Sequence, residues 1–194
     1  MSHHKLTTKK IVMVALLAAL TTAGSALRIK IPVSIVGVSA FHLGNILCAL
    51  SGILLGPWLG GLAAGLGSAI YDMMDPYYIS ECWITFLTKG AYGLVAGLIA
   101  WSGKEAWTAS GVKNYRKAYL ATIAGALAYA VIYLAKNFFY NGMLLSGLTP
   151  AAAGIIILDK LPATIFNAAI AIICAPPLAI AISKALTKNH LSTH

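Results

Sequence analysis

Polar and aromatic side chains crowd into one stretch of an otherwise apolar chain, from Tyr71 to Lys89. The stretch holds three of the chain's five carboxylates, three tyrosines, a tryptophan and a lysine. Charged groups of both signs can bind the polar atoms of a solute, and aromatic rings can stack on a planar one. We therefore interpret the stretch as one wall of a solute-binding site, with Tyr77 and Trp83 as candidate stacking residues.

A second group of polar residues lies on the apolar segment 119–140. Tyr133, Lys136, Asn137 and Tyr140 occupy positions i, i+3, i+4 and i+7, which share one face of a helix. A lysine facing lipid is costly, so Lys136 should face a bundle interior, pair with an acid or extend to the membrane surface. Tyrosines near such a surface can also form an aromatic belt. The combination of four such residues on one stripe favours a binding face.

Further candidates lie on the neighbouring apolar segments. Lys89 and Tyr92, three residues apart, form a similar face on segment 84–101, and Asn167 lies about one turn into segment 162–186. Three more polar residues either contact a ligand or only hold helices together, and both interpretations stay open: His42, Asn45 and Asp72.

No enzyme signature accompanies these residues. The chain has no GxSxG, HExxH or Walker A motif, and Asp72 and Asp75 form only a weak carboxylate pair that runs into a proline turn. The three cysteines are far apart, with no metal-ligand spacing. We predict no catalytic residue, no metal site and no cofactor, and ATP-driven work would need another chain.

Composition places the chain in a membrane. Hydrophobic residues make up 59% of it and charged residues 10%, and the mean hydropathy is +0.82, which is typical of a protein with several membrane spans. The net charge of +9 does not indicate nucleic-acid binding, because the basic residues sit at segment ends rather than along one face.

The order of apolar segments predicts an all-α membrane protein that forms one integral domain over residues 1–194. We expect an extended first external loop, over residues 28–41, that can cover a site, and a final span that Pro162 opens. The six expected transmembrane helices cover residues 11–27, 42–55, 58–74, 84–101, 119–140 and 162–186.

Basic residues indicate the orientation. With both termini in the cytoplasm of a plasma-membrane protein, nine lysines and arginines fall in inner segments and three in outer loops. The polar stretch after Tyr71 and the first loop then face outward.

Two sequence features resemble a known family. The Ala-rich first segment carries AxxxA spacings, at Ala15 to Ala19 and Ala19 to Ala23, and residues 42–72 read HLGNILCALSGILLGPWLGGLAAGLGSAIYD. Together with six short spans, these features resemble the substrate-binding S components of energy-coupling factor (ECF) ABC transporters, in the subgroup for riboflavin, hydroxymethylpyrimidine, pyridoxine or cobalamin.

The resemblance implies a subunit that captures a vitamin or vitamin precursor and has no catalysis of its own. Its partners would be a membrane-embedded coupling subunit and two ATPases, and it would dock through Ala15, Ala19 and Ala23. The residues of this chain that would contact the substrate are Tyr77, Trp83, Lys89, Tyr92, Tyr133, Lys136, Asn137, Tyr140 and Asn167.

Two other classes remain as alternatives. One is an autonomous secondary transporter or channel, although the chain has no convincing inverted repeat. The other is an intramembrane enzyme that would use Asp72, Asp75 and Glu81 as its acids.

Overall fold

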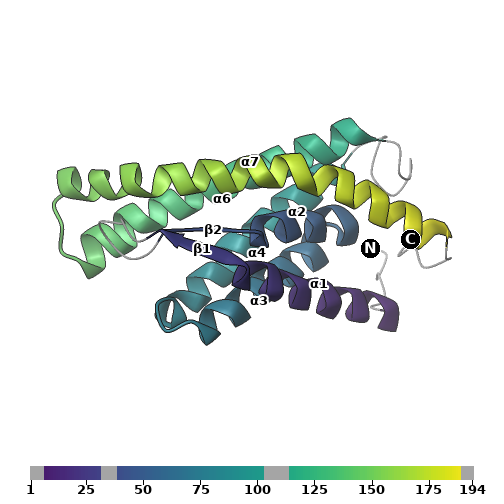
Figure 1. The fold of residues 1–194 in the computed structure, drawn as a ribbon, viewed down its shortest axis with the longest axis horizontal. Coiled ribbons are helices and arrows are strands. Elements are labelled where there is room, and N and C mark those ends of the chain that lie inside the picture. Colours follow the sequence, from purple (N-terminus) through teal and green to yellow (C-terminus); the bar gives the residue numbers. More distant parts are fainter. Residues whose placement is uncertain (1–6, 32–38, 103–113, 189–194) are drawn as a thin grey trace, which may run out of the picture.

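The computed structural model describes residues 7–31, 39–102 and 114–188 and forms a helix bundle with a small hairpin (Figure 1). In chain order its elements are α1 (Thr8–Ala26), β1 (Arg28–Ile31), β2 (Ser39–His42), α2 (Gly44–Leu55), α3 (Pro57–Met74), the 3-10 turn η1 (Ile79–Glu81), α4 (Cys82–Ala100), α6 (Tyr115–Lys136), the π-helix η3 (Asn137–Leu145) and α7 (Pro150–Lys188). Helix α1 starts and α7 ends at the same end of the bundle, while η3 lies at the other (Figure 1).

Helices α2 and α3 join without a loop. Gly56 ends α2 with a φ of 81°, a left-handed conformation that suits glycine, and Pro57 starts α3 at its first position. The Trp101 ring packs over this turn, and its Nε1 donates a hydrogen bond to the Ile53 carbonyl at 2.9 Å. The turn therefore sends the chain straight back through the bundle.

Glycines let α2, α3 and α4 pack with their backbones close together. A Cβ added to Gly93 would lie 2.7 Å from the Gly60 carbonyl, and one added to Gly97 would lie 2.5 Å from Pro57 Cα. Close backbone approach favours helix association in lipid, where no hydrophobic effect drives it. The three helices thus form the compact part of the fold on which the other elements pack.

Within the described residues, four helical stretches are long and apolar enough to cross a membrane: Thr8–Ala26, Ile79–Ala100, Tyr115–Leu145 and Pro150–Lys188. Helix α2 is apolar but has only 12 residues, about 18 Å of helix against a hydrocarbon core of about 30 Å. Helix α3 is not among the four, because its glycines and polar residues dilute its hydropathy. The fold is that of an all-α, multi-span membrane protein, and the count of six spans remains a prediction.

The last helix differs from the expectation. Pro150–Lys188 forms one continuous helix of 39 residues, with Pro162, Pro176 and Pro177 inside it, instead of a final span opened by Pro162. Proline removes a backbone donor but is tolerated in membrane helices whose freed groups find other partners. Helix α6 also differs, since η3 extends it beyond the expected end at residue 140.

The two ends of the first loop form an antiparallel hairpin, with Arg28 opposite His42 and Ile29 opposite Phe41. Residues 32–38, the middle of the expected loop, lie outside the described residues. Asn167 of α7 fixes β2: its Nδ2 donates to the Ala40 carbonyl at 2.9 Å, and its Oδ1 accepts from the His42 amide at 3.0 Å. The hairpin is therefore held against α7.

Candidate functional site

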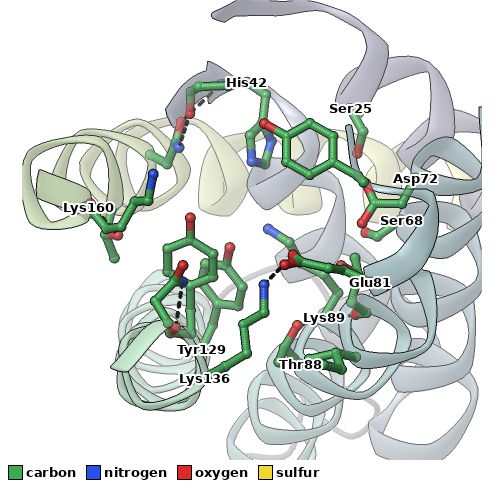
Figure 2. Close-up of a pocket in the computed structure, with 18 of the residues that line it drawn as sticks. Ser25, His42, Ser68, Asp72, Glu81, Thr88, Lys89, Tyr129, Lys136 and Lys160 are labelled. Atoms are coloured by element: carbon green, nitrogen blue, oxygen red, sulfur yellow. Dashed lines mark hydrogen bonds and ion pairs between the residues drawn. The ribbon is translucent and has the colours of Figure 1, made fainter. Parts of the chain in front are cut away.

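A cavity of about 130 Å³ lies toward the end of the bundle that is remote from the start of α1. Its walls come from the last turn of α1, the hairpin, the end of α3, the start of α4, the end of α6 with η3, and α7. Figure 2 shows the labelled side chains of these elements around a shared space. The cavity is thus built where segments far apart in the sequence converge.

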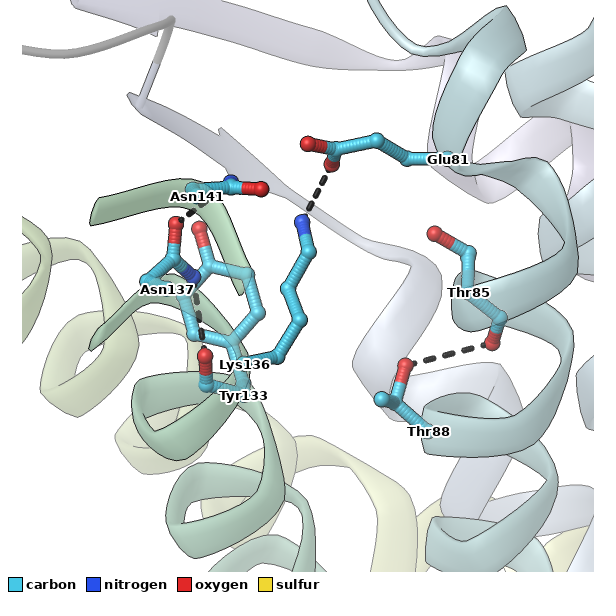
Figure 3. A network of polar contacts seen from close by, with 7 residues as sticks. All are labelled: Glu81, Thr85, Thr88, Tyr133, Lys136, Asn137 and Asn141. Atoms are coloured by element: carbon cyan, nitrogen blue, oxygen red, sulfur yellow. Dashed lines mark hydrogen bonds and ion pairs between the residues drawn. The ribbon is translucent and has the colours of Figure 1, made fainter. Parts of the chain in front are cut away.

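An ion pair joins two walls of the cavity. Lys136, the last residue of α6, pairs with Glu81 of η1 (Figure 3), and the two side chains are 10% and 19% exposed. A second pair lies on α7, where Lys160 Nζ is 3.2 Å from Asp159 Oδ2. Both lysines line the cavity, and each has its own carboxylate.

Amide side chains line the cavity where α6 becomes η3. Asn137 Nδ2 donates to the Tyr133 carbonyl at 2.8 Å, and Asn141 Nδ2 donates to Asn137 Oδ1 at 3.2 Å (Figure 3). Asn141 Oδ1 is buried and has no hydrogen-bond partner. π-Helical turns often occur at functional sites, and this one leaves a free acceptor at the cavity wall.

Lys89 is a deeply buried cation of the cavity wall, with 5% of the residue exposed. Its Nζ donates to Asn45 Oδ1 and lies 3.8 Å from the centre of the Tyr129 ring. Tyr129 stacks on Tyr133, with ring centres 5.4 Å apart, and both rings line the cavity. The α4 and α6 walls therefore combine a buried ammonium with an aromatic surface.

Arg28 and His42 bring the hairpin to the cavity. The Arg28 guanidinium lies 3.8 Å from the centre of the Tyr71 ring and 4.9 Å from that of Tyr78. Burial raises the pKa of Tyr78 to about 12, against a smaller opposing effect of Arg28. Burial, together with the charges of Lys89 and Arg28, lowers the pKa of His42 well below 6.5, so His42 is neutral at pH 7 and its Nδ1 accepts from the Gly44 amide at 3.2 Å.

Six of the nine predicted substrate-binding residues line the cavity: Tyr77, Lys89, Tyr133, Lys136, Asn137 and Asn167. Three do not. Trp83 is 56% exposed and meets only the edge of Tyr140, with ring centres 6.1 Å apart. Tyr92 is completely buried behind Tyr129, and its hydroxyl has no partner.

Several lining residues were not predicted. Tyr129 precedes Tyr133 by four residues, so the stripe on α6 could have been extended by one turn. Lys160 precedes Asn167 by seven and shares its helix face, but the expected break at Pro162 separated them. Of the three polar residues whose role the sequence left open, His42 and Asp72 line the cavity. Asn45 does not line it and instead accepts a hydrogen bond from Lys89, which does.

The alanines predicted for docking lie on the outer face of α1. Ala15, Ala19 and Ala23 are all exposed, whereas Ala18 and Thr21 are buried on the opposite side. The buried side packs on α3, where the Thr22 hydroxyl donates to the Gly67 carbonyl at 2.8 Å. The small-residue face is therefore free in this chain.

Comparison with known proteins identifies the family. The model of the family described as ECF-type riboflavin transporter, S component, matches residues 5–184. The chain belongs to this family. A Pyrococcus woesei protein described as "Uncharacterized protein in gap 3'region" is 30% identical over 124 residues, which cover 64% of this chain and 74% of the relative.

Family membership and the apolar helices make the chain a substrate-binding component of a membrane transport system. The family is one of transporter components and not an enzyme family. Separately, the described residues contain no group of three or more His, Cys, Asp or Glu side chains placed to hold a metal ion.

Proposed function

We propose that the chain captures a water-soluble vitamin or vitamin precursor at the external side of the plasma membrane. It then delivers this substrate together with a separate membrane-embedded coupling subunit and two ATPases. The observation that carries the proposal is a cavity with charged, amide and tyrosine side chains inside a bundle of apolar helices whose family is that of ECF S components. Such a mixture of an aromatic wall and a few placed polar groups is typical of small-molecule sites.

Charge distribution supports the outward orientation of this cavity. Lys9, Lys10, Lys184 and Lys188 lie at the end of the bundle where α1 starts and α7 ends, and the positive-inside rule assigns that end to the cytoplasm. The cavity lies toward the opposite end. A substrate would then enter from outside, beside the hairpin.

The substrate contacts that we propose are the six predicted residues that line the cavity, extended by Tyr129 and Asn141. Tyr129 and Tyr133 offer rings to a planar group. Asn137 and Lys136 would position polar atoms, although each also has a partner within the protein. Trp83, Tyr92 and Tyr140 lie outside this set.

The exposed face of α1 is the proposed docking surface for the coupling subunit. Alanine side chains at intervals of four let another helix approach closely, and they bury no polar group that would make the contact hard to reverse. Release of substrate requires such a reversible contact.

Two measurements test the proposal. Native mass spectrometry of the purified protein should find a vitamin-class small molecule bound, and co-expression with a coupling module should give a complex that imports it only when ATP is hydrolysed. Absence of both a ligand and a complex would refute the proposal, and uptake by the chain without ATPases would favour an autonomous transporter.

Ala15→Trp tests the docking face separately. The bulky ring should prevent assembly and uptake, while binding by the isolated subunit stays unchanged. Leu120→Trp, at a 57% exposed position of α6 away from α1, is the matched control and should leave uptake normal. Normal uptake by Ala15→Trp would remove this surface from the mechanism.

A further inference from the structure

The charges around the cavity suggest what kind of substrate it takes. We propose that the substrate is a compact, planar monoanion, a single ring that carries one carboxylate or an equivalent ionised group, and that Lys89 meets its negative charge. This inference rests on the proposed function, because it concerns the substrate of the same cavity.

The cavity wall carries an excess positive charge. Among the described residues, six charged side chains line it, four cations and two carboxylates: Arg28, Lys89, Lys136, Lys160, Asp72 and Glu81. Adding Asp159, the partner of Lys160, gives four positive and three negative charges. Glu81 and Asp159 are taken by Lys136 and Lys160, and buried Asp75, outside the lining, accepts from the hydroxyl of Tyr71, over whose ring Arg28 lies. Among the lining carboxylates of the described residues, Asp72 alone remains to offset Lys89.

Lys89 is the cation for which this lack of negative charge matters most. It is nearly completely buried, whereas Arg28 is only half-buried and already lies over two tyrosine rings. In the part of the chain that the structure describes, no carboxylate lies within ion-pair distance of Lys89, and its hydrogen-bond acceptor is the neutral Asn45 amide. An ammonium has three donors, and a buried charge without a counter-ion is costly.

Two buried amide side chains near the cavity each have a hydrogen-bonding atom without a partner, a donor near Lys89 and an acceptor on the η3 wall. Asn45 is 1% exposed, and its Nδ2 donor has no acceptor although its Oδ1 is bound to Lys89. Asn45 lies behind Lys89 and does not line the cavity, so an anion would bring its acceptor atoms to the Lys89 ammonium itself. The unpaired acceptor, Asn141 Oδ1, lies on the η3 wall. A substrate with its anion toward α4 and an N–H or O–H group toward η3 would satisfy both ends.

The enclosed volume of the cavity fits a substrate of one ring. Its volume of about 130 Å³ is similar to that of a cavity of roughly 150 Å³ that holds benzene in another protein. Tyr129 and Tyr133, with ring planes 24° apart, supply an aromatic wall for such a ring. Riboflavin, the compound in the family's name, is an uncharged molecule of three fused rings with a long side chain. It would exceed this volume and leave Lys89 without a counter-ion.

Pairs of compounds that differ only in charge test the inference. The purified protein in detergent is titrated with nicotinate and nicotinamide, with benzoate and benzamide, and with riboflavin, and the melting temperature is followed. We expect at least one carboxylate to bind at least about tenfold more tightly than its carboxamide, the factor that a charge-assisted hydrogen bond supplies. Equal or tighter binding of a carboxamide or of riboflavin would overturn the inference, as would the failure of both carboxylates to bind at millimolar concentration.

A substitution assigns the effect to Lys89. Lys89→Gln should lose at least about tenfold in carboxylate affinity and nothing in carboxamide affinity, whereas Lys89→Arg should keep the preference for the anion. Lys184→Gln, near the end of α7 remote from the cavity, is the control. If Lys89→Gln does not fold, the comparison of charged and neutral compounds on the unaltered protein still decides.

The outcome separates this inference from the proposed function. If native mass spectrometry finds a tightly bound but neutral vitamin, such as riboflavin, the capture function stands and the monoanion is wrong. If neither a ligand nor a complex with the coupling subunit is found, both fail.

Discussion

Breaking the Lys136–Glu81 ion pair on one side should destabilise the protein as much as removing it entirely. The pair joins the end of α6 to η1 across the cavity, and its side chains are only 10% and 19% exposed. A single neutral substitution, Lys136→Met or Glu81→Gln, leaves the other charge in a poorly hydrated place. The double variant leaves no charge behind.

The magnitude follows from burial. Two unit charges at about 4 Å attract each other by about 4 kcal/mol at an effective dielectric constant of about 20, and desolvation offsets much of this. Removing one partner of a fully buried pair costs about 3–5 kcal/mol, so partial exposure here should reduce the loss to about 2 kcal/mol for each single variant. The double variant should also lose about 2 kcal/mol instead of the additive sum of about 4 kcal/mol.

Chemical unfolding of the four proteins in mixed micelles measures these free energies. A second cycle with Lys184→Met and Glu81→Gln, which lie at opposite ends of the bundle, should be additive. If the Lys136→Met and Glu81→Gln losses also add within about 0.5 kcal/mol, the two residues do not interact and the reasoning fails.

Two further predictions concern packing and pH. Gly97→Ala places a methyl group 2.5 Å from Pro57 Cα and should lower the free energy of unfolding by about 1–3 kcal/mol. Gly154→Ala meets nothing within 4 Å and should raise it by about 0.5–1 kcal/mol through helix propensity. Opposite or equal shifts in melting temperature would contradict this prediction. The pKa of His42 is lower in the folded protein than in the unfolded chain. Just below pH 6.5, the imidazole therefore binds a proton in the unfolded chain but stays neutral in the folded protein. The contribution of His42 to stability should therefore be constant above about pH 7.5 and fall below pH 6.5, and His42→Gln should show a smaller loss between about pH 7.5 and about pH 5.5 than the unaltered protein.

The helical class and most of one cavity wall could be predicted from the sequence. A lysine inside an apolar helix has few acceptable positions, and this constraint led from Lys136 to the stripe on α6 that contains Asn137 and Tyr133. The acid that pairs with Lys136 could not be chosen, because Glu81 is 55 residues away and no local pattern connects the two.

Other parts of the cavity depend on tertiary contacts that have no period in the sequence. Trp83 and Tyr140 have the residue types of a stacking site, but aromatic residues at helix ends serve equally well as membrane anchors, and these two do not line the cavity. Lys160 was separated from Asn167 by a proline that usually begins a helix. Here Pro162 lies within α7, so both residues belong to one wall.

The length of α7 has a mechanical consequence. Its 39 residues extend over roughly 58 Å, more than the 40–45 Å or so of a whole bilayer with its headgroups. Such a helix has to lean or project into water, and lipid thickness then influences its angle. Lys160 and Asn167 lie in its first half and Lys184 and Lys188 near its end, so any swing of α7 moves one wall of the cavity and the opposite end of the bundle together.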